Sequence, residues 1–325
     1  MTTDKGAPVD TRRAALQRWL ARHYVRAETL RPLAADAGSR RYFRFDVDGG
    51  SRVAVDSPPE REDNATFLSV SAELVRAGVR VPRQYQADLE QGFLVMEDFG
   101  DTLFAAHASG PDATAWYERA IDVLVALHRL NPATRVRYDR ALVARELAQF
   151  PRHYLAAFNR RFTPWESTQW TRLVTWLADA FDDGPAVWTH RDFHCRNLLV
   201  LEDQTLGLID YQGALSAPPG YDLASLLRDC YVALPDTLFE HALARYADAQ
   251  GADIAGLRRC VDQLGLQRHL KCLGAFVRFD RELGKSQFLA SLPQTERYVR
   301  DAASRYPESL WLAELLEQHP VGTLT

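Results

Sequence analysis

The chain has 325 residues, enough for about two domains, and is 46% hydrophobic and 25% charged, a composition that excludes a disordered chain. The net charge is −4, so no overall positive field attracts nucleic acid or an anionic membrane. Of 39 basic residues only three are lysine, namely Lys5, Lys271 and Lys285. Chemistry that needs a lysine amine is therefore excluded from residues 6–270.

We expect no signal peptide, membrane span or redox motif from the sequence patterns. No run approaches the roughly 18 apolar residues of a membrane span, and the segment MTTDKGAPVDTRR lacks the apolar core of a signal peptide. The four cysteines are scattered without a CxxC pair, which favours reduced thiols. We expect a cytoplasmic monomer that binds neither nucleic acid nor a membrane.

The first 97 residues combine strand and helix patterns. An amphipathic pattern predicts a helix over roughly 10–27, and alternation on both sides of the turn DGG predicts a β-hairpin. A second helix should bury Phe67, Leu68, Leu74 and Val75. The expected segments are the strands 41–47 and 52–56, the helix 61–77, and the strands 81–89 and 92–97.

After residue 98 helical periodicity dominates. We expect helices near 112–130, 139–160, 164–182, 221–231, 235–249, 253–280 and 286–304, and short strands at 186–190, 197–201 and 206–210. The prediction is an α+β fold with two lobes: a small β-rich lobe, residues 1–97, and a larger helical lobe, residues 98–325, joined at a hinge near 96–98.

The segment HRDFHCRN, residues 190–197, fits the spacing H-x-D-x-x-x-x-N, and Asp210 follows 13 residues after Asn197 at the end of a strand. Phosphoryl transfer needs an aspartate that accepts the proton of the attacking hydroxyl, and oxygen ligands that hold Mg²⁺ against the phosphates. In the kinase pattern, Asp192 is the base and Asn197 and Asp210 are the metal ligands, while His190 and Arg191 hold the loop.

Asp222 lies downstream, in the segment GYDLASLLRD. Its carboxylate could cap the helix that begins there. It could also reach back to the backbone of residues 190–197. Both roles are open at this point.

The segments HRDFHCRN and LIDYQGALSAPPGYDLASLLRD resemble the aminoglycoside phosphotransferase and choline kinase-like superfamily of small-molecule kinases. Three further stretches, GSRRYFRF, VDSPPEREDNATFL and LQRHLKCLGAFVRFDRELGK, resemble its branch of bacterial anomeric N-acetylmuramate and N-acetylglucosamine kinases. The resemblance implies a protein-kinase-like fold, with a nucleotide-binding lobe over 1–97 and a catalytic and acceptor-binding lobe over 98–325. It also implies transfer from ATP, with Mg²⁺, to the C1 hydroxyl of an amino sugar in peptidoglycan recycling.

The same resemblance suggests a nucleotide site. Gly38, Ser39 and Arg40 would form the turn that covers the nucleotide, and Glu97, after Met96, would meet adenine at the hinge. For Met96, simple core packing is the alternative. Related kinases carry a phosphate-binding lysine on the third strand, and here no lysine exists to fill that role. Arg40 and Arg44 share one face of their strand and form either a phosphate clamp or solvated surface.

The acceptor side is expected on the C-terminal helices, where residues 258–300 carry nine basic residues against four acidic ones. Such a bias disfavours a polycationic antibiotic or choline and favours a neutral or anionic acceptor. Lys271 or Arg278 could pair with the carboxylate of N-acetylmuramate, or could be exposed surface charges. His194 could line the acceptor pocket or only pack. The rival functions are an aminoglycoside or other hydroxyl phosphotransferase and a non-catalytic pseudokinase.

Overall fold

The computed structural model describes residues 10–33, 39–318 and 321–323, so Gly38 and Lys5 lie outside the described residues. The chain forms two compact units. The first unit comprises residues 1–76 and 80–100, and the second comprises residues 77–79 and 101–325. The predicted assignment of nucleotide binding to residues 1–97 and of catalysis to residues 98–325 stays a prediction.

The first unit is built on a five-stranded antiparallel sheet in the order β1-β2-β3-β5-β4. The hairpin of β2 and β3 turns at Gly49, whose positive φ of 82° suits glycine, and the predicted hairpin is confirmed. Its elements are α1 (Thr11–Leu20), η1 (Ala27–Thr29), β1 (Arg31–Pro32), β2 (Arg41–Val47), β3 (Gly50–Asp56), α2 (Asn64–Arg76), β4 (Gln84–Asp88) and β5 (Phe93–Glu97).

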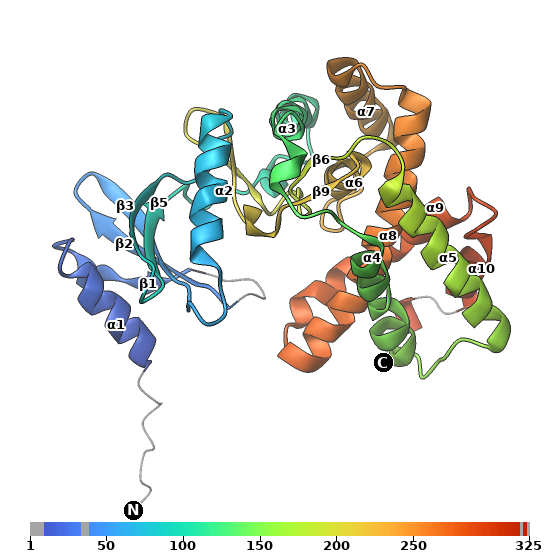
Figure 1. Cartoon of the computed structure of the whole chain (residues 1–325), viewed down its shortest axis with the longest axis horizontal. Coiled ribbons are helices and arrows are strands. Elements are labelled where there is room, and N and C mark those ends of the chain that lie inside the picture. The colour runs from blue at the N-terminus through green and yellow to red at the C-terminus, as the bar shows by residue number, and fades with distance from the viewer. Residues whose placement is uncertain (1–9, 34–38, 319–320, 324–325) are drawn as a thin grey trace, which may run out of the picture. The chain divides into compact units, whose positions relative to one another are not determined.

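Helix α1 covers one face of this sheet, where Trp19 and Leu20 pack into a core with Phe43, Phe45 and Ala54. Figure 1 draws α1 and α2 on opposite sides of the strands. Since side chains alternate along β2, residues of the other parity, Arg40 and Arg44 among them, face away from α1.

Two details of the first unit differ from the sequence-based expectation. Helix α1 ends at Leu20, because the amides of His23 and Tyr24 both bond the Leu20 carbonyl and close a turn there. Helix α2 begins at residue 64, where Asp63 accepts the amide of Thr66. The expectation that Val75 points inward is wrong, since its side chain is 56% exposed.

The second unit is mainly helical and carries two separate strand pairs, β6 with β9 and β7 with β8. Figure 1 shows α8, the longest helix, running among the others. The helices are α3 (Ala113–His128), α4 (Arg140–Leu147), α5 (Pro164–Asp182), α6 (Gly220–Leu227), α7 (Asp236–Gln250), α8 (Ile254–Leu283), α9 (Leu292–Ala303) and α10 (Leu310–Gln318). The strands are β6 (Val187–Thr189), β7 (Leu198–Val200), β8 (Leu206–Leu208) and β9 (Leu215–Ala217).

Shorter helical turns connect these elements, and they explain where the predicted helices break. The expected helix 139–160 divides into α4 and a π-helical segment, η4, at Pro151, which has no N–H to donate. The expected helix 286–304 begins as a 3₁₀ segment. Strand β9 and helix α10 were not predicted. The remaining turns are η2 (Phe104–Ala106), η3 (Pro132–Thr134), η4 (Phe150–Leu155), η5 (Tyr211–Gly213), η6 (Ser286–Ser291) and η7 (Val321–Thr323).

Helix α8 approaches the end of α4 unusually closely at Gly274. A Cβ there would lie 2.3 Å from the carbonyl oxygen of Gln149, so only glycine fits. Glu146 lies one turn before Gln149 and Lys271 lies one turn before Gly274. The close approach therefore brings these two charged side chains together, at a distance of 3.4 Å.

We predict that Gly274→Ala lowers the free energy of unfolding by about 1–3 kcal/mol, as overpacking does, although alanine is intrinsically the better helix former. Urea unfolding measures the change. Gly256→Ala on the same helix is the control, because its Cβ would meet only the carboxylate of Asp253. Equal stability of the two variants would contradict the close-approach argument.

Candidate active site

The hairpin of β7 and β8 places the two candidate metal ligands at one end. Leu198 pairs with Leu208, so Asn197, just before β7, and Asp210, just after β8, leave the hairpin side by side. The amide of Ile209 bonds the Asn197 carbonyl at 3.0 Å and closes this end. Asp210 adopts a left-handed conformation with φ 63°. The pair offers an amide oxygen and a carboxylate, the hard ligands that suit Mg²⁺.

Two buried carboxylates hold the backbone of the loop 190–197. Asp222 accepts the amides of His190 at 2.6 Å and Arg191 at 2.8 Å, and Asp229 accepts the amide of Cys195 at 2.8 Å. Asp222 is completely buried. Its reach back to the loop is confirmed, whereas the helix-capping alternative is wrong, since the start of α6 has no side-chain cap.

His190 and Arg191 hold the loop, as expected from the pattern. His190 Nδ1 accepts the Asp192 amide at 3.3 Å, which leaves Nε2 to donate to the Ile209 carbonyl at 3.0 Å. Arg191 has a positive φ of 82°, a strained conformation of the kind that gathers at functional sites. Its guanidinium forms an ion pair with Glu146.

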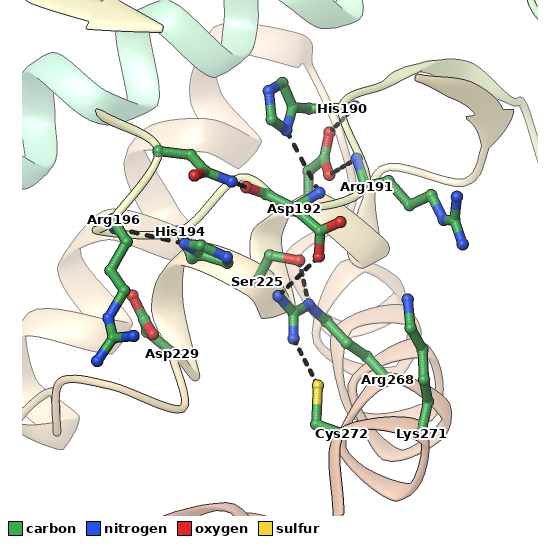
Figure 2. A network of polar contacts seen from close by, with 12 residues as sticks. His190, Arg191, Asp192, His194, Arg196, Ser225, Asp229, Arg268, Lys271 and Cys272 are labelled. Carbon is green, nitrogen blue, oxygen red and sulfur yellow. Dashed lines mark hydrogen bonds and ion pairs between the residues drawn. The ribbon is translucent and has the colours of Figure 1, made fainter. Parts of the chain in front are cut away.

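The side chain of Asp192 is 42% exposed and lies beside two cations of α8 (Figure 2). Its Oδ1 lies 3.4 Å from Arg268 Nη2. Burial opposes ionisation of this carboxyl, but the positive charges of Lys271 and Arg268 outweigh burial and hold its pKa below the usual range. Asp192 is therefore an ionised carboxylate that could accept a hydrogen bond from a hydroxyl group.

Lys271 belongs to the same cluster. Its side chain is only 16% exposed and its Nζ lies 3.4 Å from Glu146, so the alternative of an exposed surface charge is wrong. Burial lowers the lysine pKa, but Glu146 and Asp192 more than compensate and raise it. Glu146 is itself 5% exposed. Burial raises the pKa of Glu146, but the positive charges of Lys271 and Arg191 have the larger effect and bring this pKa below its usual value.

His194 and Arg196 complete the loop. His194 is buried, with its ring 5.1 Å from that of Tyr231, and burial lowers its pKa to about 4, so this imidazole is neutral near pH 7. The guanidinium of Arg196 lies 3.8 Å from the centre of the same Tyr231 ring. Arg278 lies two turns beyond Lys271 on α8, and its guanidinium lies over the ring of Phe279.

In the first unit, Arg40 is not a solvated strand residue. It is 6% exposed, and its guanidinium lies 4.8 Å from the centre of the Phe67 ring on α2. Its Nε donates to Ser57 Oγ at 3.0 Å, and its Nη2 lies 3.1 Å from Glu62. Ser39 donates to Glu62 as well.

Arg44 is also largely buried, but its guanidinium group is directed at a carboxylate. Nε and Nη2 bind the two oxygens of Asp98 at 2.6 and 2.9 Å, the bidentate geometry that suits arginine. The solvated-surface alternative is therefore wrong for both arginines.

The two hinge candidates lie on β5. Met96 is 8% exposed and packed in the sheet. The amide of Glu97 donates to the Arg83 carbonyl, and its carboxylate binds Arg80.

Sequence reasoning missed four residues at the loop: Glu146, Ser225, Asp229 and Arg268. Asp229 and Ser225 lie inside the segment GYDLASLLRD, whose spacing of buried polar residues on a short apolar helix was an available signal. No sequence signal pointed to Glu146 or Arg268, because an Arg or Glu on an amphipathic helix is indistinguishable from a surface charge until its partner is known.

A loop of this pattern, closed onto a hairpin that carries two oxygen ligands, is typical of kinase-like phosphotransferases. The comparisons with known proteins agree. A family model described as the phosphotransferase enzyme family matches residues 29–261, and the chain belongs to this family.

Two bacterial relatives align over most of the chain. One from Pseudomonas aeruginosa, named N-acetylmuramate/N-acetylglucosamine kinase, is 36% identical over 90% of this chain and 88% of its own. One of the same name from Neisseria meningitidis is 33% identical over 94% and 95%. The resemblance expected from the sequence is confirmed, and the chain is a phosphotransferase.

Solved structures show the fold. A choline/ethanolamine kinase family protein from Mesorhizobium loti matches with a TM-score of 0.64 at 17% identity, over 94% of this chain and 99% of its own. An ethanolamine kinase from Plasmodium vivax matches with a TM-score of 0.64 at 11% identity, over 91% and 88%. The α+β, protein-kinase-like fold is therefore confirmed. None of the helices in the described part of the chain is long and apolar enough to cross a membrane.

We predict that Glu146→Gln lowers the free energy of unfolding by about 3–5 kcal/mol, because it leaves two buried cations without their carboxylate. Calorimetry or urea unfolding measures the loss. Glu240→Gln is the matched control: Glu240 pairs with Arg258 at the surface, and an exposed pair contributes about 0–1 kcal/mol. Similar small losses in both variants would argue against a buried charge cluster.

Proposed function

We propose that this phosphotransferase is an ATP-dependent sugar kinase of the cytoplasm that phosphorylates the C1 hydroxyl of N-acetylmuramate or N-acetylglucosamine, in peptidoglycan recycling. This proposal rests on the loop 190–197, in which an ionised Asp192 lies near Asn197 and Asp210, the two candidate ligands of Mg²⁺. The names of the relatives that align over 90% or more of this chain supply the substrate class.

Asp192 acts as the base in this proposal. It accepts the proton of the sugar hydroxyl as the oxygen attacks the γ-phosphorus of ATP. The bond between this phosphorus and the bridging oxygen breaks, and ADP leaves. The transfer depends mainly on positioning and charge neutralisation. Asn197 and Asp210 would hold Mg²⁺, which neutralises charge on the transferred phosphoryl group. The Asn197 amide donates its Nδ2 to the Asp192 carbonyl at 2.9 Å, an orientation that leaves its oxygen for the metal. His190 and Arg191 keep the loop in this conformation.

In this proposal, the first unit binds the nucleotide. Arg40 is the better candidate for the phosphates, since Arg44 already binds Asp98 through both arms of its fork. Arg40 packs against Phe67 of α2 and pairs with Glu62, which lies two residues before that helix. The pair has the same charges as the strand lysine and helix glutamate of kinases. Ser39, with Gly38, would cover the nucleotide, and the Glu97 carbonyl, next to Met96, would meet adenine.

In this proposal, the second unit binds the acceptor sugar. His194 is a neutral donor or acceptor beside Asp192. Lys271 is a cation whose charge is shared between Glu146 and Asp192, and it would meet an anionic substituent such as the carboxylate of N-acetylmuramate. Arg278 is the second candidate for that group. These cations make an aminoglycoside a poor acceptor, because like charges repel.

Incubation with ATP, Mg²⁺ and either amino sugar should yield the sugar 1-phosphate, detected by ³¹P and ¹H NMR, which identify the hydroxyl. Tobramycin and choline are the control acceptors and should stay unmodified. Phosphate on another hydroxyl, or on tobramycin, would point to the rival phosphotransferase. Nucleotide binding without transfer to any of these acceptors would point to a pseudokinase.

Asp192→Asn should lower kcat by about 10²–10⁴-fold, the range that general base catalysis supplies, with the KM for ATP little changed. Steady-state kinetics measures the loss. Asp203→Asn, in the exposed turn of the hairpin, is the control and should keep its activity. Full turnover by Asp192→Asn would contradict the assignment of the base.

Arg40→Met should raise the Kd for ADP by about 10-fold or more, because a charge-assisted contact to phosphate is lost. Isothermal titration calorimetry measures it, and adenosine binding should stay unchanged. The control is Arg31→Met, which removes an exposed pair with Asp46 on the same sheet and a long hydrogen bond to the Thr29 carbonyl. An unchanged Kd for ADP would remove Arg40 from the phosphate site.

A further inference from the structure

Arg268 is a buried cation at the base that neither the sequence pattern nor the names of the relatives assigns. It lies on α8 and is 4% exposed. A buried charge is costly unless it is well bonded. Its position at the loop therefore calls for an explanation.

Three contacts fix the plane of this guanidinium (Figure 2). Nε donates to Ser225 Oγ at 2.6 Å, Nη1 donates to Cys272 Sγ at 3.2 Å, and Nη2 approaches Asp192 Oδ1 at 3.4 Å. Because the guanidinium is planar and rigid, bonds at Nε and Nη1 determine where Nη2 lies. Ser225 is held in turn, since its hydroxyl donates to the Tyr221 carbonyl at 3.0 Å.

Within the described residues, the Asp192 carboxylate has one hydrogen-bond donor, and that donor is Arg268. The backbone of Asp192 is held separately, by His190 and Asn197. Those bonds place the Cα of the base but leave its side-chain torsions unrestrained. Among the described residues, Arg268 is therefore the one that restrains the carboxylate through a hydrogen bond, while Lys271 acts on it through its charge.

Helix α6 connects the two restraints. Asp222, on its first turn, binds the loop backbone, and Ser225, three residues later, sets the guanidinium that faces the carboxylate. Helices α6 and α8 are packed in close contact, because a Cβ at Gly220 would lie 2.6 Å from the sulfur of Cys260. Loop and guanidinium are therefore positioned by one rigid element.

Charge gives Arg268 a second effect on the same step. The transferred phosphoryl group is anionic and must approach the anionic Asp192, which repels it. Glu146 already lies between Arg191 and Lys271, so Arg268 is the cation of this cluster that has Asp192 as its ion-pair partner. It offsets the repulsion without the reorganisation that water would need.

We propose that Arg268 is the positioning residue of the base: it holds the Asp192 carboxylate in one orientation and compensates its charge as the phosphoryl group approaches. This role rests on the proposed function of Asp192 as the base. It requires that removal of the guanidinium changes turnover and leaves nucleotide binding unchanged.

The first test is structural and needs no acceptor. Crystal structures of the wild-type protein and of Arg268→Met, both with MgADP, should show one Asp192 rotamer in the former and several, or a different one, in the latter. An Asp192 side chain that keeps its rotamer in Arg268→Met would overturn the proposal. This outcome can be read whether or not the chain phosphorylates an amino sugar, so it is separable from failure of the proposed function.

The second test is kinetic, with whichever hydroxyl acceptor the wild-type protein phosphorylates, or with slow ATP hydrolysis if there is none. Arg268→Met should lower kcat by about 10²-fold, the effect of a misplaced catalytic group, with the KM for ATP unchanged. Arg268→Lys should recover part of the loss. In an Asp192→Asn background Arg268→Met should cost little more, because the two residues act as a unit. Additive losses would overturn the proposal.

Two further variants separate positioning from folding. Ser225→Ala removes the acceptor of Nε, together with the bond that this hydroxyl donates to the Tyr221 carbonyl. It should give a smaller loss of kcat with a normal melting temperature. Arg259→Met removes an exposed arginine of the same helix, which lies over the Tyr306 ring, and should leave kcat unchanged. A kcat for Ser225→Ala equal to that of the wild type, with Arg268→Met unfolded, would assign Arg268 a structural role instead.

Discussion

The second unit depends on one buried carboxylate. Asp222 accepts two successive backbone amides of the loop 190–197 and is completely buried. These bonds satisfy donors that would otherwise be unpaired beside a strained residue, Arg191. His128 and Tyr246 pack around it, with His128 Nε2 3.5 Å from Asp222 and Nδ1 2.6 Å from the tyrosine hydroxyl. The first two residues of the loop are therefore anchored to α6.

Around this anchor the charges are arranged in alternation. Arg191, Glu146 and Lys271 form one buried chain, and Asp192 and Arg268 form a second contact beside it. Removal of Glu146 would leave Arg191 and Lys271 without the carboxylate that they share. Removal of Arg268 would leave Asp192 without its ion-pair partner. The same arrangement keeps Asp192 ionised and prevents its charge from repelling an anionic group. Stability and chemistry therefore draw on the same residues.

Among its described residues, the first unit contains arginines but no lysine. A compact amine could reach a phosphate from the third strand, but the sequence has no lysine there. Arg40, just before β2, instead reaches past Ser57 to Glu62 and Phe67. A planar, weakly hydrated cation tolerates such burial better than an ammonium group. The scarcity of lysine is thus compatible with phosphate chemistry.

From the sequence by itself, the resemblance of whole segments to a known family indicated the family and the protein-kinase-like fold. Spacing and periodicity predicted most elements and the loop 190–197, because both are local properties of the sequence. It could not place Glu146, Lys271 or Arg268, since a charged residue on a helix looks the same whether it faces water or a partner. The sequence also did not decide whether Asp222 caps a helix or binds the backbone of the loop 190–197. Only the tertiary structure decided these, because close packing at Gly274 and Gly220 brings α4, α6 and α8 within bonding distance of one loop.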